Sequence, residues 1–78
     1  MTRIRFSLTE AAAVNLHVYD AAGRLVRRLL HGEVCARGDN ATVWNGRDDA
    51  NRQVAAGVYF CRLEAGGNEA VTRITLVK

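Results

Sequence analysis

Hydrophobic and polar residues alternate along most of the chain, in short runs that are separated by turn signals. A period of two is typical of a strand with one face against a core and the other in solvent. The segment Thr2–Leu8 has this pattern, because Ile4, Phe6 and Leu8 share one face and charged or hydroxyl residues occupy the other. No window carries a sustained helical stripe, so the pattern predicts an all-β chain.

Further segments predict strands by the same rule. They cover residues 14–19, 24–30, 40–44, 58–64 and 69–77, and they alternate with turns at Asp20–Gly23, Asn45–Gln53 and Gly66–Asn68. In residues 24–30 the parity breaks at Arg27-Arg28, so we expect a bulge there. We expect a loop from Gly32 to Asp39. Six or seven short strands at regular spacing predict a small immunoglobulin-like β-sandwich of about seven antiparallel strands.

The length of the chain limits what it can do. Its 78 residues, 49% of them hydrophobic, suit one domain over residues 1–78. That leaves no room for a second lobe or a deep pocket, and no catalytic constellation stands out, so we expect a domain that is not an enzyme and has no cofactor. No apolar stretch is long enough for a signal peptide or a membrane span. We expect the C-terminal part of a longer secreted or surface protein.

The positive net charge does not point to a nucleic acid. The net charge of +3 comes mostly from arginines that are spread over every segment and interleaved with eight acidic residues. Nucleic-acid interfaces need basic residues that cluster as well as an excess of positive charge. We therefore expect protein partners, no nucleic acid and no membrane insertion.

Four segments in order resemble one known family. They are Thr2–Leu8, Val18–Val26, Trp44–Asp49 and Ala56–Leu63. Together they are similar to the Ig-like domain of the bacterial flagellar hook-capping protein, and to the related C-terminal sorting domains of the type IX secretion system. The chain departs from the family pattern in having no Pro and in having Asn51 where the family has Gly.

The resemblance implies a seven-stranded sandwich without catalytic residues, located outside the cell or on its surface after passage through the periplasm. It implies a module for secretion sorting or for anchoring at the cell surface. The alternative is a structural subunit or tip that assembles through edge strands, as a homo-oligomer or with neighbouring subunits. Unpaired edges can accept a partner strand, and residues 2–8 and 69–77 are the expected edges.

The motif residues are interpreted as scaffold. Trp44 would close one end of the core and needs a partner for its indole N–H. Asn45-Gly46 is a favoured turn dipeptide, and Asp48 and Asp49 can accept backbone N–H bonds. The other two motif residues lie further along the chain: Gly57 lets the chain turn into a strand, and Tyr59 points inward.

Cys35 and Cys61, 26 residues apart, are the candidate disulfide. Closing a loop of that size would stabilise the fold by about 3.5 kcal/mol in the chain-entropy model. The alternative is two independent cysteines, one buried and one exposed, and the sequence leaves both interpretations open. Two cysteines with two histidines make a poor zinc site, because no spacing brings four ligands together.

Other short motifs carry less weight. Asp48, Asp49 and Asn51 are candidate Ca²⁺ ligands, but calcium takes six to eight oxygens and Asx turns explain the same residues. Residues 37–39 spell an adhesion tripeptide and residues 40–42 a glycosylation acceptor, both of which arise often by chance. His17 is expected to be an exposed strand residue.

Overall fold

The computed structural model describes residues 1–77, and six strands lie in this range. They are β1 (Thr2–Leu8), β2 (Ala12–Asp20), β3 (Leu25–Cys35), β4 (Gly38–Trp44), β5 (Gly57–Ala65) and β6 (Asn68–Leu76). The described residues contain no helix that could cross a membrane.

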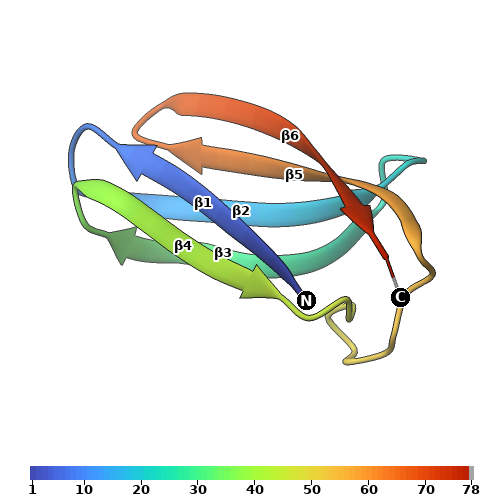
Figure 1. Ribbon diagram of the computed structural model, residues 1–78. Coiled ribbons are helices and arrows are strands. Elements are labelled where there is room, and N and C mark those ends of the chain that lie inside the picture. Colours follow the sequence, from blue (N-terminus) through green and yellow to red (C-terminus); the bar gives the residue numbers. More distant parts are fainter. Residues whose placement is uncertain (78) are drawn as a thin grey trace.

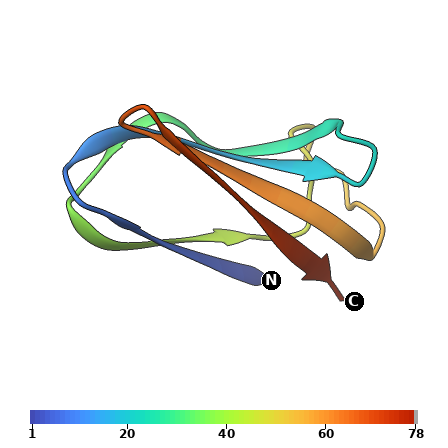
Figure 2. The ribbon, with the colours of Figure 1, turned by 90° about the horizontal axis from the view of Figure 1, so that it is seen from above.

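The strands form two antiparallel sheets that pack face to face (Figures 1 and 2). One sheet holds β1 and β4, and the other has the order β3-β2-β5-β6. The prediction of a small all-β, immunoglobulin-like sandwich is confirmed, with six strands in residues 1–77 in place of about seven. The expected edge strands β1 and β6 lie at sheet edges, and so do β3 and β4.

The core follows the alternation of the sequence. On β2, every second residue from Val14 to Val18 is buried, whereas the residues between them face the outer surface. On β5, Tyr59 and Cys61 point inward, as their parity indicates. The largest side chain of the core is Trp44, which is completely buried although it ends a strand of the smaller sheet. The buried set is Ile4, Val14, Leu16, Val18, Trp44, Tyr59, Cys61, Ile74 and Leu76.

Strand β3 differs from its prediction. The expected bulge at Arg27-Arg28 is confirmed, because the register of β3 against β2 shifts on both sides of that pair. The expected loop from Gly32 to Asp39 is wrong, because β3 continues to Cys35 and β4 begins at Gly38. A third bulge at Gly32 lets the strand continue through the predicted loop. Gly32 takes φ +77, and its N–H donates to Asn15 Oδ1 at 2.8 Å.

The two ends of the molecule differ. The N-terminus and the end of β6 lie at one end, together with the β2–β3 turn and the loop between β4 and β5 (Figures 1 and 2). The β1–β2, β3–β4 and β5–β6 connections lie at the opposite end, which we call the tip. A domain of this shape presents its tip away from whatever is joined to its termini.

Candidate functional site

Trp44 and Tyr59 form the corner where the two sheets meet. Their rings contact edge to face, with centroids 5.1 Å apart and planes inclined by 71°. The indole N–H donates to the Arg47 carbonyl at 2.9 Å, and the Tyr59 hydroxyl donates to the Ala55 carbonyl. Both buried polar groups therefore have a partner, as buried Trp and Tyr require.

The Asn45-Gly46 dipeptide turns the chain directly after Trp44. Asn45 Oδ1 accepts the Arg47 N–H at 3.1 Å, which is an Asx turn. Gly46 takes φ +74 and is buried against Leu76, so that a Cβ there would lie 3.4 Å from a Leu76 methyl group. Both the backbone conformation and the close packing explain why glycine occupies this position.

Asp48 organises the rest of the loop. Its Oδ1 accepts the backbone N–H groups of Ala50 and Arg52, at 3.0 and 2.9 Å. The Arg52 N–H is the main reason that the pKa of Asp48 lies below its ordinary value, because these bonds favour the charged carboxylate. Asn51 takes the left-handed conformation with φ +63.

The β2–β3 turn repeats this geometry. Asp20 Oδ1 accepts the backbone N–H groups of Ala22 and Arg24, and Gly23 takes φ +85 in the place that Asn51 holds in the other loop. The Arg24 N–H is again the main cause of a lowered aspartate pKa. The two segments share the pattern Asp-x-Ala-(Gly/Asn)-Arg, so the same aspartate-centred turn occurs twice in the chain.

Asp49 joins the loop to the edge of the larger sheet. Its N–H donates to the Val26 carbonyl, and its Oδ1 accepts the Arg28 N–H, both at 3.0 Å. Arg27 also donates to the Asp48 carbonyl, at 3.3 Å. The loop therefore occupies part of the β3 edge and makes that part unavailable to another strand.

The opposite edge of the same sheet lies along β6. Residues Asn68 to Arg73 are exposed on both faces of the strand, and burial begins at Ile74. Among the bonds of the described residues, no loop bridges to the β6 edge as Asp49 does to β3.

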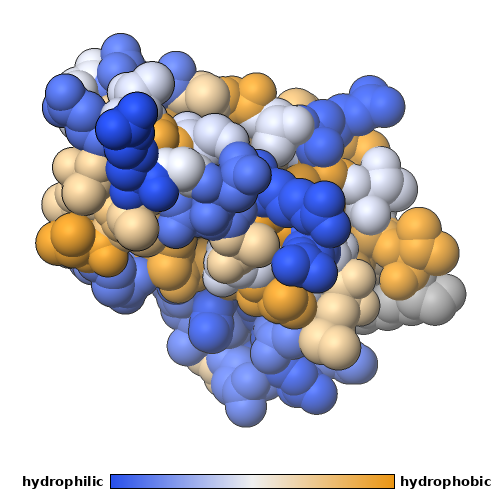
Figure 3. All heavy atoms as spheres, turned by 60° about the vertical axis from the view of Figure 1, so that its left-hand side comes forward, coloured by the Kyte–Doolittle hydropathy of each residue, from blue (hydrophilic) through white to orange (hydrophobic). Residues whose placement is uncertain are grey.

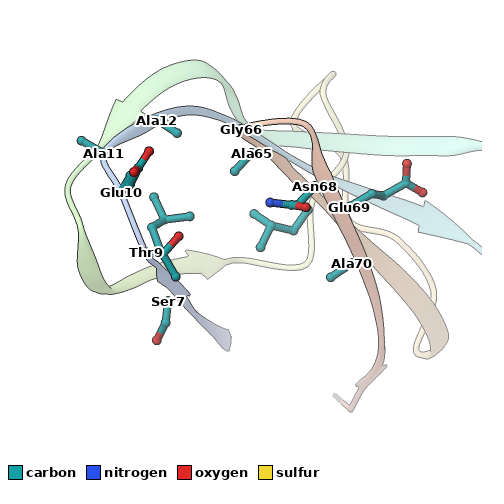
Figure 4. Close-up of a pocket in the computed structure, with 12 residues that line it drawn as sticks. Ser7, Thr9, Glu10, Ala11, Ala12, Ala65, Gly66, Asn68, Glu69 and Ala70 are labelled. Carbon is teal, nitrogen blue, oxygen red and sulfur yellow. The ribbon is translucent and has the colours of Figure 1, made fainter.

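A hollow lies at the tip, between the end of β1 and the start of β6 (Figure 4). Its volume is about 380 Å³. Asn68 turns toward the hollow, whereas Glu69 turns away from it and binds Arg62 at 2.7 Å. Leucine and alanine side chains supply the apolar part of the lining, and Glu10 is the acidic residue of the lining that is not paired with an arginine in this way. The lining residues are Ser7, Leu8, Thr9, Glu10, Ala11, Ala12, Leu63, Ala65, Gly66, Asn68, Glu69 and Ala70.

The candidate disulfide is contradicted, because Cys35 and Cys61 are both free. Cys61 lies opposite Val18 of β2, and Cys35 lies opposite Ala12. Six residues along a strand span about 20 Å. A disulfide needs Cα atoms within about 7 Å, so the topology forbids this one. Burial raises the pKa of the Cys61 thiol to about 11.

Metal ligands are few. No group of three or more His, Cys, Asp or Glu side chains that could hold a metal ion occurs in residues 1–77. For the Ca²⁺ candidates, the loop already uses the oxygens: the Asp48 and Asp49 carboxylates accept backbone N–H bonds, and the Asn51 carbonyl accepts from Arg47.

Sequence reasoning missed three features: the Asp49 bonds to β3, the hollow, and a contact between the two histidines. His17 lies on the outer face as expected, but it is partly buried instead of exposed, and its Nε2 faces His31 Nδ1 at 3.1 Å. Burial is the main reason that the pKa of His17 is lowered. The bulges of β3 place His31 diagonal to His17, and counting residues from the turn does not reveal this.

The outer surface is mixed. On the face seen in Figure 3, hydrophobic residues are interspersed with hydrophilic ones. Val34, Val71 and Val77 are among the exposed large hydrophobic residues. Isolated exposed residues of this kind are normal for soluble domains.

The comparisons agree with the fold. The family model described as the FlgD Ig-like domain matches residues 2–75. A solved structure of FlgD from P. aeruginosa superimposes with a TM-score of 0.75 at 23% sequence identity, over 95% of this chain. This chain spans 59% of the length of that protein. No curated protein matches at a significant level. The chain belongs to the FlgD Ig-like domain family.

Proposed function

We propose that this domain is a non-catalytic, extracellular assembly module that binds a neighbouring protein by adding a strand to the open edge of β6. The observation that supports this proposal most directly is the difference between the two edges of the larger sheet. Asp49 closes part of the β3 edge, whereas the first six residues of β6 are exposed on both faces. An open edge offers backbone N–H and C=O groups in a row, and these bind an extended segment of any sequence.

The hollow at the tip would give such a segment specificity. A strand beside β6 would run next to the hollow, where Leu63 and Ala70 can contact a small apolar side chain. Glu10 is the charged residue on which this recognition depends, because Glu69 turns away and pairs with Arg62 (Figure 4), and no basic residue contributes to the lining. The chemistry therefore suits an extended protein segment that carries small apolar residues and one Lys or Arg.

The position of the tip suits an assembly role. It lies opposite the end that carries the N-terminus and the end of β6 (Figure 1). A parent protein joined at that end would leave the tip accessible to a neighbour. The family model is described as the FlgD Ig-like domain, and the resemblance of the sequence segments to the flagellar hook-capping protein supports the extracellular location.

Secretion sorting or cell-surface anchoring of a parent protein is the second candidate. It is supported by the same shape (Figure 1), because a domain whose N-terminus and end of the last strand lie at one end can be joined to a larger protein without disturbing the sandwich. In this case a component of the secretion machinery would bind the tip and the β6 edge.

A photo-crosslinking amino acid at position 71 of the native, full-length protein tests the proposal in its own cells. Val71 is 59% exposed on β6. We expect adducts to a second copy or to another subunit of an extracellular assembly. Adducts to the secretion machinery would support sorting instead. The matched control is position 58, because Val58 is also exposed but lies on the inner strand β5. Equal adducts from both positions, or none from position 71, would contradict strand addition at β6.

A further inference from the structure

The two histidines of the chain face each other on the outer surface of the larger sheet. His17 is on β2 and His31 on β3, and Nε2 of the first lies 3.1 Å from Nδ1 of the second. The ring centroids are 5.2 Å apart and the planes are inclined by 27°. Because the centroids are about 2 Å farther apart than the nitrogens, the rings meet edge to edge, and each directs a nitrogen at the other.

This spacing is that of two ligands on one transition-metal ion. Imidazole nitrogens bind such ions at about 2.0–2.1 Å, so two of them in adjacent coordination positions lie about 2.9–3.4 Å apart. The observed 3.1 Å falls in this range without any movement of the backbone. Because the two nitrogens point at each other in a hydrogen bond, both rings must rotate about their side-chain bonds, and that bond must break, before their lone pairs can meet at one ion. We propose that His17 and His31 form a bidentate surface site for a divalent transition metal, with Cu²⁺ bound most tightly and water or an added chelator in the remaining positions.

The order of metals follows from the ligands. Neutral imidazole suits copper, nickel and zinc, and affinity for such a site rises to a maximum at Cu²⁺. In the free site one facing nitrogen carries the hydrogen of the contact. When the metal binds, that hydrogen moves to the other nitrogen of the same ring through solvent, so that a neutral pair loses no net proton.

The charges around the pair oppose one another. Arg28 lies opposite His17 on β3, and Arg62 lies opposite it on β5. Both cations disfavour a metal ion. Glu64 and Asp49 act on His17 with the opposite sign, and the Arg62 guanidinium is bound by Glu69 and Glu64. Arg28 has only a longer ion pair, 4.0 Å from Asp49, and its charge lowers the pKa of His17, so it is the cation that most weakens the site.

The experiment uses the full chain with Cys35→Ser, so that the half-buried thiol of residue 35 does not reduce the probe. The probe is the Cu²⁺–iminodiacetate complex, which leaves two adjacent positions open and so favours a pair of ligands over a single one. We expect an electron paramagnetic resonance spectrum with two imidazole nitrogens on each copper. We expect His17→Asn and His31→Asn to weaken binding by about tenfold or more, because the second imidazole no longer binds within the same molecule.

Two further variants test whether copper binding depends on the positions of the two histidines and on the charge beside them, and not only on the number of histidines. His31→Asn combined with Arg73→His keeps two histidines but puts one on β6, two strands away from β2. We expect this variant to bind as weakly as the single variants. Arg28→Gln should tighten binding severalfold. Equal affinity of the relocated and original pairs, or one imidazole nitrogen per copper in the original chain, would overturn the proposal.

Discussion

Trp44 stabilises the fold in two ways, by its volume and by its N–H bond to the Arg47 carbonyl. Trp44→Phe leaves a gap in the core and removes that bond. We expect the free energy of unfolding in urea to fall by about 2–3 kcal/mol. Val58→Ala, on the exposed face of β5, should change it by less than about 0.5 kcal/mol. A loss at Trp44 as small as the loss at Val58 would show that the indole is not the centre of the core.

Gly46 and Gly23 both take positive φ, at +74 and +85, but their surroundings differ. An added Cβ at Gly46 meets the Leu76 methyl groups, whereas at Gly23 it meets open space. Gly23→Ala should therefore cost about 1–2 kcal/mol from backbone strain alone. Gly46→Ala should cost more, because Leu76 must also move. Thermal unfolding of the two variants compares the costs, and equal values would mean that the contact with Leu76 has no effect.

Asp48 makes the free energy of unfolding depend on pH in the acidic range. Its folded-state pKa is lowered from 3.8, so the charged form stabilises the fold above that value. This contribution is lost as the pH falls through the lowered pKa. Asp48→Asn keeps one acceptor oxygen but cannot titrate. We expect the variant to be less stable than the original chain near neutral pH, and the difference to shrink as the pH falls below 3.8 and through the lowered pKa. Urea unfolding at neutral and at acidic pH measures it, and an unchanged difference would contradict this role of the carboxylate.

At the scale of elements, Asp49 determines how much of the β3 edge is free. Asp49→Ala removes the acceptor of the Arg28 N–H. We expect this amide to exchange with solvent faster and the variant to associate at lower concentration, because an edge strand with free N–H groups can bind another chain. Ser7→Ala, which removes an exposed bond to Asp39, is the control. Unchanged exchange at Arg28 would mean that Asp49 does not protect the edge.

The pattern of the sequence predicts elements better than it predicts how they pair. Alternation indicated the strands and the inward faces of β2 and β5, since each face depends only on parity. It placed a loop after Leu30, where Gly32 forms a bulge with Asn15 and the strand goes on. A bulge depends on a bond to another strand, and no local pattern contains that information.

The same limit applies to the candidate site. Local turn chemistry indicated the roles of Asn45 and Asp48, because both bond to backbone only two to four residues away. The bonds of Asp49 to β3 and the contact between His17 and His31 join residues far apart in the chain. The candidate disulfide is wrong for the same reason: it requires two sites that the register of β2 holds apart.

At the scale of the whole molecule, the two thiols report on different depths of the fold. Cys35 is half-buried at the end of β3, whereas Cys61 is 1% exposed. We expect an alkylating reagent to modify Cys35 in the native state. Cys61 should react only when the sandwich opens, because burial both excludes the reagent and keeps the thiol protonated, with a pKa of about 11. Mass spectrometry counts the adducts. In the Cys35→Ser variant, only the slow reaction of Cys61 should remain. A chain mass that is lower by two hydrogens under oxidising conditions would indicate a disulfide and would contradict the two free thiols.

Comparison of Cys61 with Trp44 then shows whether the two sheets separate together. Cys61 lies in the larger sheet and Trp44 ends a strand of the smaller one. Both belong to the same core, so we expect the free energy of opening from Cys61 alkylation to equal the free energy of unfolding from Trp44 fluorescence. Equal values mean that neither sheet persists alone, because each covers the only buried face of the other. If Cys61 opens at a lower free energy, the sheets part before the corner at Trp44 unfolds, and the cooperative core proposed here is wrong.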